Sequence, residues 1–226
     1  MKHGFISILP LAAGAALYGF AFGVLAAQVG FPWWGVALMS AFVHAGSSQI
    51  VAVEQFAAGE FVAGAVIAGA ALNLRYLGII ASLADVLKDI PFRLRLIAIH
   101  ITGDENWALT MAKRVNDPNI GAWFLIGSGI TMISVWVVST TAGALIGKAI
   151  PNLEEFGLGF AFTAAFIAMA RAMFVGRRNV VACLMTFGVT VILTRFGVSG
   201  AYAILGGSLI GLAISTAARA RAGDIQ

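Results

Sequence analysis

Residues 40–55, SAFVHAGSSQIVAVEQ, place small and polar side chains in the middle of an apolar part of the chain. Between Gly4 and Val53 there is no Asp, Glu, Lys or Arg. The stretch nevertheless carries a histidine, a glycine, two adjacent serines and a glutamine in close succession. What these groups do depends on the solvent that surrounds them.

The composition indicates that this solvent is a lipid bilayer. Hydrophobic residues make up 60% of the chain and charged residues 11%, whereas ordinary soluble domains carry about 25% charged residues. The apolar runs are long and unalternating, which favours spanning helices of about 20 residues over the shorter, alternating strands of a membrane barrel. We therefore predict an all-α integral membrane protein.

The length of 226 residues leaves room for about seven such helices in one transmembrane domain. Residues 85–120 are expected to form an amphipathic connector on the cytoplasmic side. The predicted spans are 6–29, 34–56, 61–83, 121–147, 157–175, 179–195 and 198–216.

The basic residues predict an orientation, because cytoplasmic loops are enriched in Lys and Arg. If all seven segments cross, most basic residues share the side of the connector, which places the C-terminus in the cytoplasm and the N-terminus outside. In the alternative, residues 34–56 form a re-entrant hairpin and Lys2 lies in the cytoplasm. Such loops account for the net charge of +4, so no nucleic-acid partner is expected.

The chain also contains a candidate internal repeat. A shift of 124 positions superimposes WGVALMSAFVHAG on LGFAFTAAFIAMA, and it brings the GxxxG pair Gly19 and Gly23 onto Gly143 and Gly147. Such pairs let helices pack closely. Because three spans separate the equivalent helices, we predict an inverted repeat, a plan common in secondary transporters. Its parts are 5–84 and 121–197, followed by a final helix at 198–216.

The polar stretch predicts an interrupted helix near the bilayer midplane. Irregular backbone is tolerated there only against protein or a water-filled cavity, so these side chains should face the bundle interior. A break at 45–47 leaves free N–H groups at the start of a half-helix, with Ser47 or Ser48 as its cap, which suits a carboxylate. The alternative is that small residues serve helix packing and the hydroxyls bond their own carbonyls.

Two further clusters carry polar groups. Asn73 and Arg75 lie within the third predicted span, where Arg75 either extends to the headgroups or points into a cavity as a fixed cation. Asp104 and Glu105 follow Gly103 in an otherwise apolar part of the connector. They form a surface turn, or else they return towards the cavity to balance Arg75 or carry a proton.

Together, AFVHAGSSQ, LNLRYL and TGDENWAL resemble the AzlC family of branched-chain amino acid permeases in order and spacing. The chain departs from the family pattern at His44, Tyr76 and Gly103. The resemblance implies a multi-pass protein of the bacterial cytoplasmic membrane that exports branched-chain or related hydrophobic amino acids. It also implies a small AzlD-type partner subunit and exchange for protons.

We expect a transporter rather than an enzyme, with no cofactor or metal. The polar half-helix start should bind the substrate carboxylate, amide groups its ammonium and aromatic side chains its apolar part, while titratable groups couple protons. The substrate-binding candidates are Gly46, Ser47, Ser48 and Arg75 for the carboxylate, Gln49 and Asn73 for the ammonium, and Phe42 and Phe166 for the side chain. The proton-coupling candidates are His44, Asp104 and Glu105.

Two other functions compete with this reading. A passive channel for small polar solutes also suits a polar-lined break. An intramembrane serine hydrolase would use Ser47 or Ser48 with a histidine base, but His44 and Ser48 lie one turn apart on the same predicted helix.

Overall fold

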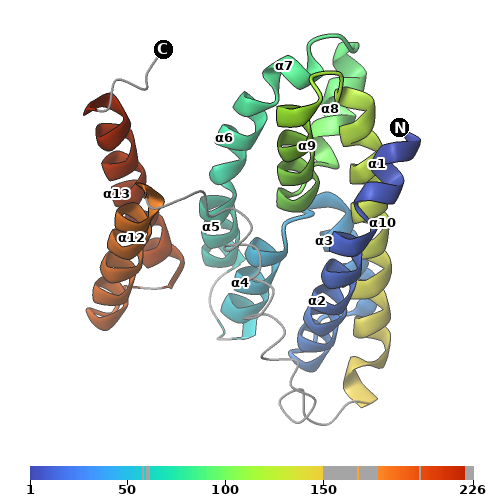
Figure 1. Ribbon diagram of the computed structural model, residues 1–226. Coiled ribbons are helices and arrows are strands. Elements are labelled where there is room, and N and C mark those ends of the chain that lie inside the picture. Colours follow the sequence, from blue (N-terminus) through green and yellow to red (C-terminus); the bar gives the residue numbers. More distant parts are fainter. Residues whose placement is uncertain (58, 60–61, 150–166, 168–177, 199, 222–226) are drawn as a thin grey trace.

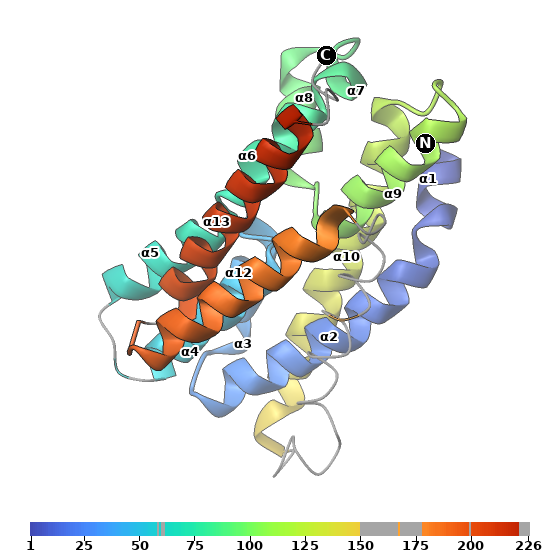
Figure 2. The same ribbon diagram turned by 60° about the vertical axis from the view of Figure 1, so that its left-hand side comes forward.

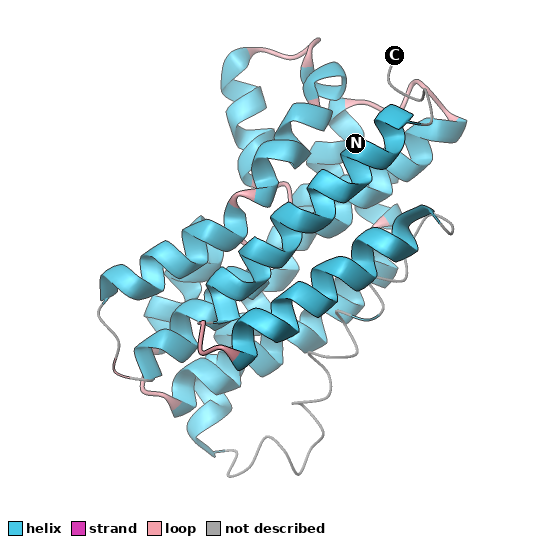
Figure 3. Cartoon of the chain, turned by 90° about the vertical axis from the view of Figure 1, so that its left-hand side faces the viewer, coloured by secondary structure: helices cyan, strands magenta, loops and turns pink. Residues whose placement is uncertain are grey.

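The computed structural model describes residues 1–57, 59, 62–149, 167, 178–198 and 200–221 (Figure 1). Every regular element among them is a helix, joined by short loops (Figure 3), which confirms the all-α class. The helices are α1 Lys2–Ser7, α2 Leu9–Gln28, α3 Trp33–Phe42, α4 Gly46–Ala57, α5 Val62–Asn73, α6 Arg75–Ser82, α7 Ala84–Leu87, α8 Phe92–His100, α9 Asp104–Asn116, α10 Ala122–Ile146, η1 Gly147–Ala149, α12 Arg178–Arg195 and α13 Gly200–Arg221.

Two of the described helices, Leu9–Gln28 and Ala122–Ala149, are long and apolar enough to cross a membrane. The total of seven spans stays a prediction. The fifth predicted span, 157–175, lies outside the described residues apart from Ile167.

Helices α2 and α10 form the most closely packed pair in the bundle, and glycines make this possible. A methyl group at Gly23 would overlap the carbonyl oxygen of Thr140, and one at Gly143 would overlap the carbonyl oxygen of Phe20. The backbones therefore touch where the two GxxxG pairs lie, as expected for small residues at a helix–helix interface.

The direction of this pair corrects the predicted repeat. Gly127 lies against Met1, and Gly147 lies against Val24 and Ala27, so α2 and α10 run parallel (Figure 1). Helices related by an inverted repeat would run antiparallel. The inverted relation is therefore wrong for this pair, and its other half, 158–170, lies largely outside the described residues.

The physical reason is that residues 34–56 turn back on themselves. Helix α3 ends at Phe42 and α4 begins at Gly46. The rings of Phe31 and Phe56, at the two open ends, are 4.7 Å apart between centroids, and Gln49 donates a hydrogen bond to Ser40 at 3.1 Å. The segment is thus the re-entrant hairpin of the alternative prediction, with its tip at 43–45, and not a crossing helix.

A second hairpin, α8–α9, enters the bundle from the opposite end (Figure 1). Ala98 and Ile101 are buried against Leu125 and Ile126 of α10. At the tips, His100 Nε2 lies 3.0 Å from the carbonyl oxygen of Ala41. These buried side chains join the core, whereas Phe92, Leu96 and Val115 of the same hairpin are exposed. The cytoplasmic connector at 85–120 stays a prediction.

The re-entrant hairpin α3–α4 also changes the position of the N-terminus. With one crossing removed, α1 lies at the same end of the bundle as the basic segments around α7, α8 and the end of α9 (Figure 1). The expectation that the N-terminus lies opposite these basic residues is therefore not met.

Helix α10 joins two buried clusters. Its first half packs with α6, α7, α8 and α9 through residues such as Leu83 and Leu125. Its second half packs with α2, α3 and α4 through residues such as Phe22, Val53 and Trp136. Each hairpin consequently belongs to a different cluster. The α12–α13 pair contacts the bundle through α5 (Figure 2).

The re-entrant hairpin predicts a specific cross-link. In a C183S background, cysteines placed at Phe31 and Phe56 should be joined by a short bis-maleimide in membranes, because their rings touch. A straight helix would hold these positions about 38 Å apart. Mass spectrometry of the digested protein detects the linked peptides.

The pair F31C/V115C is the matched control, because the end of α9 lies at the opposite end of the bundle (Figure 1). Absence of the F31C/F56C product, with both cysteines reactive towards single maleimides, would show that residues 34–56 cross.

Candidate functional site

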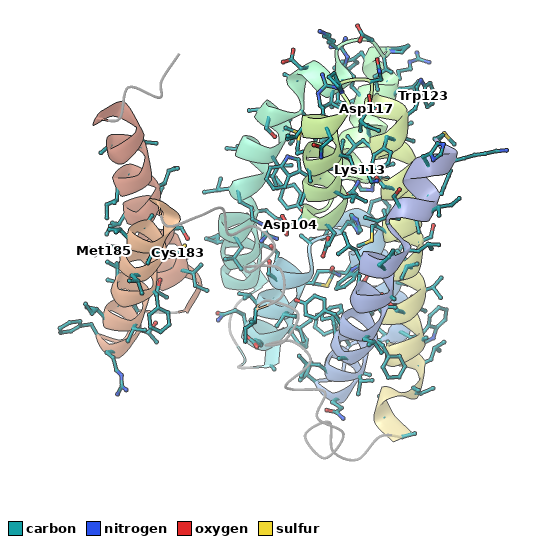
Figure 4. The ribbon with its side chains drawn as sticks, viewed as in Figure 1. Asp104, Lys113, Asp117, Trp123, Cys183 and Met185 are labelled. Carbon is teal, nitrogen blue, oxygen red and sulfur yellow. The ribbon has the colours of Figure 1, made fainter. Side chains whose placement is uncertain are left out.

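Three helix interruptions lie close together inside the bundle. They separate α3 from α4 at 43–45, α5 from α6 at Leu74, and α8 from α9 at 101–103. Asp104, at the start of α9, lies near mid-height of the bundle (Figure 4). Because free backbone groups at such depth need protein or water partners, this is where a polar site can exist.

The first tip is shaped by His44 and Gly46. His44 has a φ of +43°, which a non-glycine residue rarely adopts. A side chain at Gly46 would overlap the rings of Tyr18 and Trp136, so only glycine fits. Helix α4 begins at Gly46, and the N–H groups of its first turn have no partner within the helix. Ser47 and Ser48 lie in that turn, so neither is the predicted cap.

The second tip is fixed by a capping interaction. Gly103 precedes α9 in extended conformation, and its N–H donates to Asn106 Oδ1 at 2.6 Å. The fully buried Asn106 amide also lies within 3.5 Å of the carbonyl oxygen of Leu125 on α10. This bonding sets the position of the first turn of α9, which carries Asp104 and Glu105.

Arg75 connects the two tips. Its Nη2 lies 2.8 Å from Asp104 Oδ2 on α9 and donates a hydrogen bond to Ser47 Oγ on α4 at 3.2 Å. Its guanidinium also lies over the ring of Tyr76, 5.6 Å from the centroid. Arg75 therefore points into the bundle and pairs with an acid, which is one of the two alternatives that the sequence left open. Asp104 likewise does not lie in a surface turn.

A second bond joins the neighbouring residue of α4 to the end of α5. Ser48 Oγ donates to Asn73 Oδ1 at 2.8 Å. The adjacent serines of α4 thus bind the two polar residues on either side of the Leu74 interruption, which aligns α4 with α5 and α6.

His44 is the polar side chain of the first tip that these bonds leave out. Both of its ring nitrogens are buried and have no hydrogen-bond partner among the described residues. A methyl group at Gly103 would lie 3.5 Å from His44 Nε2, so the ring faces the second tip. A buried imidazole without partners can accept or donate a proton to a bound molecule.

These groups surround a small cavity of about 40 Å³, lined by both tips and by aromatic side chains of α2 and α10. A second cavity of about 180 Å³ lies on the other side of His44 and is also lined by Asn73, Tyr76 and His100. Arg75 faces two carboxyl groups, Asp104 and Glu105, at the first cavity. The arrangement can bind a molecule that carries both a positive and a negative group.

Gln49 has a different environment from the other predicted residues. It is fully buried, accepts a hydrogen bond from Trp136 Nε1 at 2.9 Å and donates one to Ser40, which in turn accepts one from Thr140 at 2.9 Å. Its amide is thus used to fasten the α3–α4 hairpin to α10. The structure does not bring it to the polar cavity.

Of the two predicted aromatic residues, Phe42 does not join the site. It is 74% exposed at the end of α3, and it lines neither the cavity around Arg75, nor the cavity of about 180 Å³, nor a larger one between α4 and α5. Phe166 lies outside the described residues. Tyr18 and Trp136 line the cavity instead. Their surrounding sequences carry no charged residue and gave no signal for a site.

Comparisons with known proteins place the chain among membrane proteins. The family model described as "AzlC protein" matches residues 10–150. The inner membrane protein YgaZ of Escherichia coli is 28% identical over 90% of the chain and 84% of its own length. A membrane protein of Helicobacter pylori J99 is 28% identical over 83% of the chain and 86% of its own length.

The branched-chain amino acid transport protein AzlC of Bacillus subtilis is 26% identical over 74% of the chain and 65% of its own length. No solved structure matches the chain.

The bonds of Gln49 predict a structural role. The change Q49A should lower the free energy of unfolding by about 1–3 kcal/mol, because Trp136 and Ser40 lose buried partners. Thermal unfolding in detergent measures the loss. Gln55, half-buried on the same helix, is the control, and Q55A should leave the midpoint unchanged. Equal stability of the two variants would refute the role.

Proposed function

Because the chain belongs to the AzlC family, we propose that it is a secondary transporter that exports branched-chain or related hydrophobic amino acids. We further propose that export is coupled to protons and that a small AzlD-type membrane subunit acts with this chain. The chain is a helical membrane protein, and the bacterial cytoplasmic membrane is its proposed location.

The observation that carries this proposal is the bridge from Arg75 to Asp104 and Ser47. Ionisable residues inside a membrane bundle are costly and usually mark a transport pathway. Here a cation of α6 meets an acid of the α8–α9 hairpin and a serine of the α3–α4 hairpin beside a cavity. This is the arrangement expected of a transporter site with helix interruptions around it.

An amino acid zwitterion can replace the partners that Arg75 and Asp104 have in the bridge. Its carboxylate would bind Arg75 and the first turn of α4 at Gly46, Ser47 and Ser48, where the free N–H groups and the helix dipole favour an anion. Its ammonium would bind Asp104, with Glu105 and Asn73 as further acceptors. The small polar cavity suits the charged groups of the substrate.

Proton coupling is assigned to His44, Asp104 and Glu105. All three line the same cavity as Arg75. His44 is the first choice because histidine changes charge near neutral pH, and its ring nitrogens are buried without partners among the described residues. Protonation of His44 would add a positive charge beside Arg75 and weaken the hold of the site on the substrate ammonium.

The positive-inside rule assigns both termini to the cytoplasm in this proposal. In Figure 1 helix α1 and the last turn of α13 lie at the end of the bundle that carries the basic segments of α8 and α9. That end faces the cytoplasm because basic residues are retained there.

Neither competing function is favoured by the geometry. A hydrolase needs a serine bonded to a base, whereas Ser47 accepts from Arg75 and Ser48 donates to Asn73. A passive channel needs a continuous polar path, and the described tips meet across the bundle.

Replacement of Arg75 tests the site. R75A should reduce leucine export about tenfold or more, because a hydrogen-bonded charge partner of the substrate is lost. Export is measured as intracellular accumulation of leucine in cells fed a leucine dipeptide and as counterflow in proteoliposomes. Counterflow against a gradient also separates a carrier from a channel.

The control for R75A is R93A, an exposed arginine at the start of α8. Unchanged leucine export by a correctly inserted R75A protein would remove this residue from the site.

The proton-coupling role of His44 is tested by H44Q. This variant should lose leucine efflux driven by a pH gradient while it retains leucine–leucine exchange at equal pH, since exchange needs no net proton movement. Flux in proteoliposomes measures both, and H3Q, at the exposed N-terminus, is the control. Full pH-driven efflux by H44Q would assign coupling to another group.

A further inference from the structure

A larger cavity of about 360 Å³ lies beside the polar site, between the α3–α4 hairpin and α5. Helix α4 contributes Ser48, Ala52 and Phe56, which are spaced four residues apart and so lie on one face of the helix. Val66 and Asn73 of α5 lie on the facing side. The cavity therefore runs lengthwise between two helices, and we call it the α4–α5 groove.

The polarity of the α4–α5 groove changes along its length. Its polar lining side chains, Ser48 and Asn73, lie at the end nearest the hairpin tip, where they are bonded to each other. At the other end it is closed by Phe56 and Phe31, whose rings are in edge contact. From Ser48 to Phe56 is about 12 Å along a helix. A ligand with a polar head and an apolar tail matches this order.

The groove also neighbours the polar site. The cavity of about 180 Å³ shares Val43 and Asn73 with the groove, and it shares His44 and Tyr76 with the cavity around Arg75. The three cavities thus follow one another around the tip of the first hairpin. The groove is therefore within reach of the apolar part of a small molecule whose charged groups bind at the tip.

We propose that the α4–α5 groove is the specificity subsite for the aliphatic side chain of the substrate, with Ala52 and Phe56 as determinants of its size. This inference rests on the proposed function. It replaces the predicted aromatic pocket, since Phe42 lies elsewhere. The groove is wide enough for a branched side chain, and it ends in Phe56, which limits the length of the ligand.

A lipid acyl chain is the rival occupant, because several groove residues, such as Val43 and Val66, are also exposed at the surface of the bundle. The polar end favours the substrate. An acyl chain has no group for Ser48 or Asn73, whereas an amino acid brings its ammonium and carboxylate to that end. In the bonded pair, Ser48 adjoins Ser47 and Asn73 lies two positions before Arg75. Ser47 and Arg75 bind the charged groups in the proposed function.

The test is a change of groove size followed by a change of substrate preference. A52F should fill the groove. Competition by leucine and isoleucine for counterflow of labelled valine should then become about tenfold or more weaker relative to competition by alanine. F56A should lengthen the groove, so phenylalanine and methionine should become stronger competitors relative to valine. The two variants change size in opposite directions, so a general folding defect cannot produce both shifts.

The matched control is A57F, which adds the same ring at an exposed position of α4 outside the groove. In A57F, the strength of competition by leucine relative to alanine should stay at the wild-type value. If wild type exchanges these amino acids and A52F and F56A leave every ratio unchanged, the subsite is wrong while the proposed function stands.

If A52F changes only the amount of lipid that copurifies, an acyl chain occupies the groove and the inference is overturned. If wild type exchanges no hydrophobic amino acid, the proposed function fails and the subsite fails with it.

Discussion

A helix can stop inside a bilayer only where protein or water receives its free backbone groups. This constraint explains why the interruptions in this chain lie together. The tips of the α3–α4 and α8–α9 hairpins enter from opposite ends and meet, with His100 bonded to the carbonyl oxygen of Ala41. Each tip supplies protein partners for the polar groups of the other tip. A polar site therefore forms where neither segment would be stable alone.

Arg75 follows from the same constraint. A cation at this depth is tolerated when it is paired, and its partners come from both hairpins, Asp104 from one and Ser47 from the other. The bonds between the hairpins and Arg75 are therefore made by the groups that a zwitterion would need. Binding of a substrate at Arg75 must compete with the contact between the hairpins, which links occupancy of the site to their relative position.

Much of this site was predictable from the sequence because polar groups in an apolar chain have few permissible positions. The break near Gly46 came from that reasoning, and the pairing of Arg75 with Asp104 was one of the alternatives that it left open. The reversal of the chain after Phe42 was only an alternative based on Lys2, because helical periodicity is the same for a helix that continues and for one that turns back. Gln49 was assigned to the substrate because composition cannot distinguish an amide facing a cavity from one bonded to a buried Trp136.

The fastening of the two hairpins indicates where the protein can move. The first is tied to the second half of α10 by Gln49 and Trp136, and the second to the first half of α10 by Asn106. These bonds are buried, where a lost partner costs about 1–3 kcal/mol. The bridge at the tips involves Arg75, which is 38% exposed and whose partners a substrate or water can replace. Relative motion at the tips thus costs less than detachment of either hairpin from α10, and access to the site should change there.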